Sequence, residues 1–163
     1  MDSGIDFKNL WAEVERNFVL GKHSFHGPGH WQQVEQNGLL LAGLNGADKT
    51  IVRLFAAFHD SCRESEGYDP EHGRRAAALL TTNRGSLFEI DDDLFAELHF
   101  AISHHNDGTT TDDLNIGTCW DGDRMDLPRV GITPVPSKMN TFHGKQFAAL
   151  GADQFDDEFL NDD

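Results

Sequence analysis

Residues 54–60 read LFAAFHD, an apolar run that ends abruptly in a histidine followed by an aspartate. An imidazole and a carboxylate at the end of a buried segment destabilise a fold unless a partner binds them, and a metal ion binds both. The run continues an apolar pattern of helical spacing that begins after Asp48, a suitable N-cap. The stretch therefore predicts a buried helix that presents His59 and Asp60 at its end.

The composition is that of a globular protein with a strong negative charge. The chain has 163 residues, 38% of them apolar, which is enough for one domain with its own core. Its 28 acidic and 13 basic residues give a net charge of -15. Such a surface repels nucleic acid polymers and anionic membranes. The acidic, amphipathic start and the lack of a long apolar run predict a cytoplasmic protein, and the oligomeric state stays open.

Helical periodicity recurs along the chain, whereas strand patterns are almost absent. We therefore expect an all-α, single-domain helical bundle. The first three expected helices cover residues 5–20, from His30 to a turn at 43–46, and 48–60. A fourth starts at residues 69–71, a fifth runs from the cluster at 91–93 to residue 105, and a sixth covers 114–127. A weaker pattern predicts a seventh helix over 141–150.

The end of the chain differs in charge from the rest. After Gly151 there is no Lys or Arg, and the acidic residues are Asp153, Asp156, Asp157, Glu158, Asp162 and Asp163. We therefore divide the chain into a helical domain of residues 1–150 and an acidic C-terminal tail of residues 151–163. The tail is expected to be solvated, with at most one docked turn of helix.

Several histidines fall at expected helix ends. His30 begins one helix, His59 ends another, His72 lies in a first turn, and His104 and His105 end a further helix. Helix ends of a bundle can converge on one pocket, so these side chains can meet in space. Residues 120–131, WDGDRMDLPRVG, supply aspartates and arginines that follow in sequence.

The order of these residues resembles the H…HD…D signature of the HD superfamily of metal-dependent phosphohydrolases, an all-helical family. The similarity extends over roughly residues 20–131 and is closest to small bacterial HD-domain proteins. It implies that His30, His59, Asp60 and Asp123 bind a metal. Asp121 fits the loose last part of the motif equally and remains the alternative to Asp123.

Further histidines stand where some members of that superfamily have additional ligands. The resemblance implies that His72, His104 and His105 contribute to a second metal site, with Asp60 shared between two ions. Capping is the alternative for these residues, because histidine and a following glycine are both common at helix ends.

The expected cofactors are divalent metal ions, two of them. Imidazole and carboxylate ligands favour Mn, Fe, Ni, Co or Zn over Mg, which prefers oxygen. Arg63 and Arg124 are expected to hold phosphate oxygens, with Arg129 and Lys22 as other candidates. Asp60, Arg63 and Arg124 are thus the predicted catalytic residues.

The resulting hypothesis is a metal-dependent phosphohydrolase that cleaves a small phosphate ester, such as a nucleotide, with a metal-activated hydroxide. The GYP motif of cyclic dinucleotide phosphodiesterases is absent. Two alternatives remain, namely a di-iron oxygenase of the same fold and a non-catalytic metal-binding protein.

Overall fold

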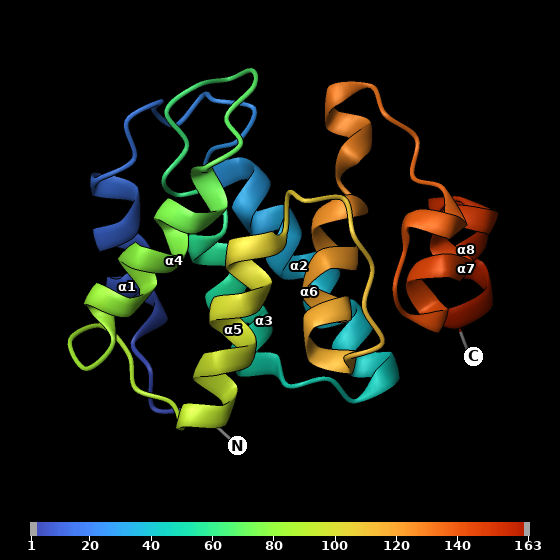
Figure 1. Cartoon of the computed structure of the whole chain (residues 1–163). Coiled ribbons are helices and arrows are strands. Elements are labelled where there is room, and N and C mark those ends of the chain that lie inside the picture. Colours follow the sequence, from blue (N-terminus) through green and yellow to red (C-terminus); the bar gives the residue numbers. More distant parts are fainter. Residues whose placement is uncertain (1–2, 162–163) are drawn as a thin grey trace.

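The computed structural model describes residues 3–161, and this part of the chain is helical without a β-strand. Eight α-helices and two short 3-10 helices follow one another (Figure 1): α1 (Phe7–Arg16), α2 (Pro28–Asn45), α3 (Lys49–Phe58), α4 (His72–Asn83), α5 (Asp92–His104), α6 (Leu114–Arg124), η1 (Leu127–Val130), η2 (Pro136–Lys138), α7 (Phe142–Leu150) and α8 (Ala152–Phe159). The predicted all-α class is confirmed.

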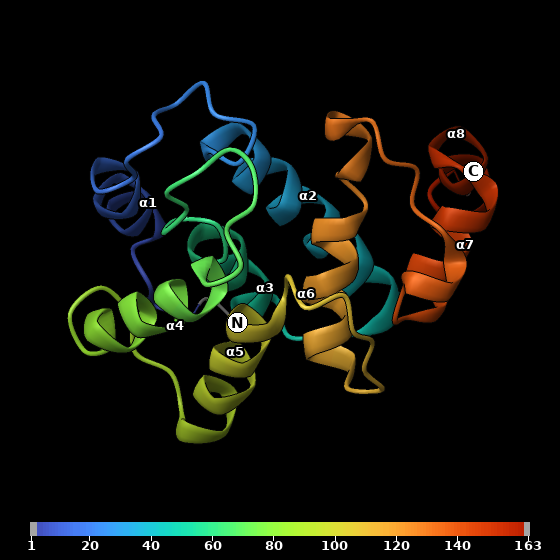
Figure 2. The ribbon, with the colours of Figure 1, turned by 45° about the horizontal axis from the view of Figure 1, so that its top comes forward.

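Helix α3 lies at the centre of the bundle. It contacts α1, α2, α4, α5 and α6, and the views of Figures 1 and 2 both place it among them. Phe55 and Phe58 are fully buried, because neighbours cover this helix on most sides. The Asp48 side chain caps its start by accepting hydrogen bonds from the backbone N–H groups of Thr50 and Ile51. The core thus forms around the helix that ends at His59.

The fourth helix begins later than its sequence predicts. The expected start at residues 69–71 is a turn, and α4 begins at His72. The Asp69 carboxylate accepts hydrogen bonds from the Arg75 guanidinium at 2.7 and 2.8 Å and from the Glu64 backbone N–H, so it is not available as an N-cap. This network holds the loop of residues 59–71 against the start of α4.

The first and sixth helices are shorter than their apolar patterns. Helix α1 ends at Arg16, and residues 17–27 form a loop before Pro28 opens α2. Helix α6 ends at Arg124, and η1 contains Pro128 in its first turn. Proline is compatible with a first turn, so the chain restarts there as a 3-10 helix.

The C-terminal segment forms a helical pair at the edge of the bundle. Helices α7 and α8 pack against each other beside α6 and η2 (red in Figure 1). Most of the predicted acidic tail is therefore α8, whose Phe155 is fully buried. Asp162 and Asp163 lie outside the described residues, and the division at residue 151 stays a prediction. Within residues 3–161, each helix is too short or too polar to cross a membrane.

Close contact between α4 and α5 allows a stability prediction. A Cβ atom at Gly73 would lie 2.8 Å from the backbone oxygens of Ile102 and Ser103, so Gly73→Ala must separate the two helices. We expect a loss of about 1–3 kcal/mol in the free energy of unfolding, measured by urea denaturation. Gly43→Ala is the control, because its Cβ meets no atom within 4 Å and alanine favours helix. Equal stability of the two variants would contradict this packing.

Candidate metal centre

The end of α3 sets the positions of His59 and Asp60. His59 caps the helix and its ring stacks on Phe55, with centroids 4.9 Å apart. Its Nδ1 donates to the backbone oxygens of Phe55 and Ala56 in the last turn of α3, and the Phe55 oxygen also accepts the His59 backbone N–H. The His59 side chain is 0% exposed and that of Asp60 only 5% exposed. Both polar groups therefore face the interior.

A first group of ligand atoms gathers at one oxygen of Asp60. His30 Nε2 lies 3.3 Å and His59 Nε2 3.6 Å from Asp60 Oδ2. Asp123 Oδ1 completes the group at 3.1 Å from His30 Nε2 and 3.5 Å from His59 Nε2. Helices α2, α3 and α6 thus bring together the four residues that the HD-like signature implies.

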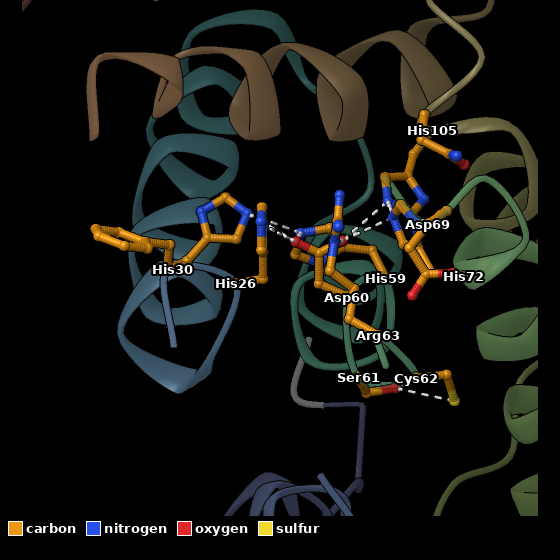
Figure 3. A network of polar contacts seen from close by, with 12 residues as sticks. His26, His30, His59, Asp60, Ser61, Cys62, Arg63, Asp69, His72 and His105 are labelled. Atoms are coloured by element: carbon orange, nitrogen blue, oxygen red, sulfur yellow. Dashed lines mark hydrogen bonds and ion pairs between the residues drawn. The ribbon is translucent and has the colours of Figure 1, made fainter. Parts of the chain in front are cut away.

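A second group gathers at the other oxygen of the same carboxylate. His72 Nε2 and His105 Nε2 each lie 3.1 Å from Asp60 Oδ1 and 2.9 Å from each other. In Figure 3, Asp60 lies between His30 on one side and His72 and His105 on the other. We call these six residues the histidine–aspartate cluster: His30, His59, Asp60, His72, His105 and Asp123.

The tautomers of the four histidines follow from their outer partners. Each Nδ1 atom faces an oxygen that accepts a hydrogen bond, so each Nδ1 carries the proton. The acceptors are Asp126 Oδ2 for His30, the α3 carbonyls for His59, Asp69 O for His72 and Ile102 O for His105. Each Nε2 atom of a neutral ring then presents a lone pair to the interior of the cluster.

When all four rings are neutral, these lone pairs face each other without a donor between them. The Nε2 atoms of His30 and His59 are 3.1 Å apart, and those of His72 and His105 are 2.9 Å apart. Two ligand atoms about 2.1 Å from one ion lie about 3.0 Å apart at a right angle and about 3.4 Å apart at the tetrahedral angle. Both groups therefore fit divalent transition metals, and both satisfy the chemistry of a metal site.

Opposite charges dominate the cluster when no metal is bound. Burial lowers the pKa of His30, but hydrogen bonds to surrounding carboxylates outweigh burial and raise the pKa from 6.5 to about 10. Burial raises the pKa of Asp60, yet His59 and the other histidines hold it well below its ordinary value. Asp123 behaves in the same way beside His30 and His59. Without a metal, the proton on His30 thus supplies the positive charge that balances the buried carboxylates.

This proton makes metal affinity depend on pH. His30 must lose it before its Nε2 can bind a metal, so raising the pH toward 10 favours binding. We expect the apparent affinity for Mn²⁺ to rise about tenfold per pH unit for each proton released between pH 6.5 and 8.5. Competition titrations with a chelator of known pH dependence measure this slope. An affinity independent of pH would contradict the assigned protonation of His30.

Two candidate ligands lie elsewhere. His104 points away from the cluster, since its Nδ1 pairs with Asp107 Oδ2 at 2.6 Å and its side chain is 36% exposed. Asp121 is fully buried, and its carboxylate accepts four hydrogen bonds of 2.7–2.9 Å from Asn140 and Thr141 at the start of α7. The structure thus brings His105 and Asp123 into the cluster, but not His104 or Asp121.

The two arginines predicted to be catalytic border the cluster differently. Arg63 Nε lies 3.9 Å from Asp60 Oδ1, is buried and has no hydrogen-bond partner among the described residues. Its Nη1 donates to the backbone oxygens of Ser65 and Gly67, which fix the guanidinium. Arg124 instead donates to the backbone oxygens of Lys138 and Thr109. Arg63 therefore has a donor left for a ligand, whereas both Nη atoms of Arg124 hold the backbone.

A pocket of about 420 Å³ opens onto the cluster. Asp60, His72, His105 and Asp123 form one side of it. His26 also lines it, with Nδ1 3.7 Å from Asp60 Oδ2 and Nε2 donating to Glu66 O. A volume of this size is in the range of small-molecule sites. The ligand atoms are therefore accessible to a small molecule from one side.

Asp126 is a functional candidate that sequence reasoning missed. Its Oδ2 accepts the His30 Nδ1 proton at 2.7 Å and so orients that ring. The signal was available, because Asp126 follows Asp123 by three residues, a spacing that puts both on one side of a helical turn.

Removing this outer carboxylate should weaken metal binding. We expect Asp126→Ala to lower the affinity for Mn²⁺ by about 10- to 100-fold, because His30 loses its orienting partner. Asp126→Asn keeps an acceptor oxygen and should retain more affinity. Titration with Mn²⁺ by calorimetry measures both variants. Wild-type affinity in Asp126→Ala would mean that the ring is oriented by other contacts.

Comparisons with known proteins agree with the architecture. No family model matches the chain, and no curated protein matches it. A solved structure does: the crystal structure of a predicted HD superfamily hydrolase from an uncultured Thermotogales bacterium. The TM-score is 0.63 at 24% identity, over 95% of this chain and 87% of the other.

The fold and the cluster together define the class of protein. The chain is an all-helical protein with the HD-type fold, in which histidines and aspartates from α2, α4 and α6 and from the ends of α3 and α5 form groups able to hold metal ions. The fold that the sequence signature implied is therefore confirmed.

Proposed function

We propose that this protein is a metal-dependent hydrolase that cleaves small phosphate esters. One observation carries the proposal: the two oxygens of Asp60 each face a separate group of imidazole Nε2 atoms. A carboxylate in this position can join two metal ions, an arrangement used to activate water and to clamp a phosphoryl group.

The six cluster residues would hold the metals in two sets. His30, His59, Asp60 and Asp123 supply one set, and Asp60, His72 and His105 supply the other. Bound divalent metals supply Lewis acidity toward phosphoryl oxygens and make water a nucleophile at neutral pH. Four imidazoles favour Mn, Fe, Ni, Co or Zn over Mg.

The protein itself contributes charge and a fixed arrangement of the metal ligands. Arg63 has a buried Nε without a partner beside Asp60, so it can donate to a phosphate oxygen. The imidazoles on the pocket side are fixed by backbone oxygens, which keeps the ligand set rigid before substrate arrives.

The pocket and the overall charge favour a small substrate. A volume of about 420 Å³ suits a small phosphate ester such as a nucleotide, and the net charge of -15 disfavours a nucleic acid polymer or an anionic membrane. Arg63, Arg124, Arg129 and Lys138 line the pocket and offset this charge locally.

The test begins with metal analysis of the purified protein. Apoprotein is then loaded with Mn, Fe, Co, Ni, Zn or Mg and assayed for phosphate release from aryl phosphates and nucleotides. We expect hydrolysis with the transition metals at about two equivalents bound. Arg63→Met should raise KM, because it leaves the metal ligands intact while removing a donor to phosphate.

Two other outcomes identify the alternatives. Turnover that requires iron and dioxygen, and stops under anaerobic conditions, would identify a di-iron oxygenase. Absence of turnover with every metal, together with tight metal binding, would identify a non-catalytic metal-binding protein. Comparing iron-loaded protein with and without dioxygen separates the first alternative from hydrolysis, which does not need dioxygen.

A further inference from the structure

We infer that the pocket accepts a substrate with a second anionic group, which Lys138 binds, and an apolar body between this group and the phosphate. The inference deepens the proposed function and rests on it for the position of the phosphate. It concerns the wall of the pocket that η1, η2 and the residues between them form. This wall lies across the pocket from the histidine–aspartate cluster.

An apolar wall supports the first half of the inference. Leu127, Val130 and Ile132 line the pocket, and Val130 and Ile132 are 40% and 52% exposed. Exposed apolar side chains at the border of a pocket are stabilised when a ligand with apolar surface covers them. An inorganic phosphate held at the metals would leave this wall exposed to water. The wall therefore favours an ester whose organic part packs against it.

The cations around the pocket differ in what they can still bind. The Arg124 guanidinium donates to Lys138 O and Thr109 O, and Arg129 donates to Phe25 O, Asp126 O and His26 Nδ1. The guanidinium groups of these two arginines are therefore already hydrogen-bonded within the protein. Arg63 retains Nε, but beside Asp60, where the phosphate is expected.

Lys138 is the remaining cation, and its backbone is fixed while its ammonium is not. Its N–H donates to Val135 O, and its carbonyl accepts from Arg124 Nη1 at 2.7 Å. Its side chain is exposed, and no ion pair within residues 3–161 involves the ammonium group. Arg124 follows Asp123 directly, so the Lys138 backbone is anchored next to the cluster. The pocket thus offers one free donor beside Asp60 and another on η2.

A neighbouring hollow of about 450 Å³ is the competing place for a second anion. It shares Arg63, His72 and Asn106 with the pocket. Its other charged residues are mostly acidic, namely Asp69, Glu71 and Asp107, and its Arg74 pairs with Glu71 at 3.2 Å. An anion there would meet carboxylates, whereas Lys138 offers an unpaired ammonium. The charges therefore favour the side of Lys138.

Two matched ligands test the inference independently of turnover. Benzylphosphonate and 4-carboxybenzylphosphonate differ by one carboxylate, and their carbon–phosphorus bonds resist hydrolysis. Calorimetry with Mn²⁺-loaded protein should show that the carboxylated ligand binds about tenfold more tightly, as expected for a hydrogen bond between charged groups. Lys138→Met should reduce this ratio to near one. Lys145→Met, an exposed lysine of α7 outside the pocket, should leave it unchanged.

The apolar wall is tested with the same ligands. Ile132→Ser should weaken the binding of both phosphonates several-fold and preserve their ratio. Unchanged binding of both would overturn the assigned wall. A wild-type ratio near one, a ratio that persists in Lys138→Met, or failure of both phosphonates to bind would overturn the role of Lys138.

Hydrolysis of phenyl phosphate and 4-carboxyphenyl phosphate separates this inference from the proposed function. If the phosphonate ratio depends on Lys138 but neither ester is hydrolysed, the subsite stands and the hydrolase proposal fails. If both esters are hydrolysed with equal kcat/KM and the phosphonates bind equally, the hydrolase proposal stands and the subsite is overturned.

Discussion

Asp60→Asn is expected to abolish metal binding at both groups and to reduce hydrolysis by at least ~1000-fold, since metal ions contribute several kcal/mol of transition-state stabilisation. Asparagine keeps the shape of the side chain but removes the charge and one acceptor oxygen. Because Asp60 Oδ2 serves His30 and His59 while Oδ1 serves His72 and His105, one substitution acts on both groups. Metal content by mass spectrometry and phosphate release measure the effect.

Asp107→Asn is the matched control for this variant. Asp107 is also an aspartate hydrogen-bonded to a histidine, but it lies outside the cluster and pairs with His104. It should keep both metal equivalents and most of the activity. Full metal content together with full activity in Asp60→Asn would refute the entire assignment of the site.

His105→Ala should remove one metal equivalent and retain the other, with a large loss of activity. Its Nε2 belongs to the second group, and the first group does not include it. His104→Ala, at the adjacent residue, should leave the metal content unchanged because its ring pairs with Asp107. Metal analysis of the two variants side by side gives the result.

The comparison also decides the number of metals. Loss of one equivalent in His105→Ala alone means two sites that share Asp60. A wild-type protein that binds one equivalent at saturation, and a His105→Ala variant that equals it, would mean that the second group is structural. A loss in His104→Ala would mean that the ring turns inward when metal binds.

Capping side chains in the sequence predicted a helix start correctly where the side chain binds the backbone of its own helix. Asp48 caps α3 as the sequence predicted, and the weakly predicted helix of residues 141–150 is α7, which Thr141 caps by accepting from Gly144 N. Asp69 had the same local signal but binds Arg75, a contact within the folded loop. Helix α8 is longer than the single docked turn that the sequence predicts. Phe155 is buried against Phe147 of α7, and the acidic composition of the tail does not reveal this contact.

The motif predicted which residue types meet and favoured Asp123 with Asp121 as the alternative, but it did not separate His104 from His105. Adjacent residues on a helix point about 100° apart, so only one of His104 and His105 can reach Asp60. Asp121 and Asp123 are two residues apart and point to different sides of α6. The choice depends on how α5 and α6 pack, which is a property of the whole bundle.

The buried Asp121 carboxylate has a consequence for how the protein opens locally. It holds the start of α7 through Asn140 and Thr141, and a Cβ at Gly144 would overlap it, so carboxylate and helix start are in close contact. Asp123, two residues along the same helix, belongs to the cluster. Separating α7 from the bundle would remove the four hydrogen bonds that this carboxylate accepts, two residues from Asp123 on α6. The C-terminal helices and the metal centre are therefore joined through α6, and we expect loss of the contacts between α7 and Asp121 to destabilise both.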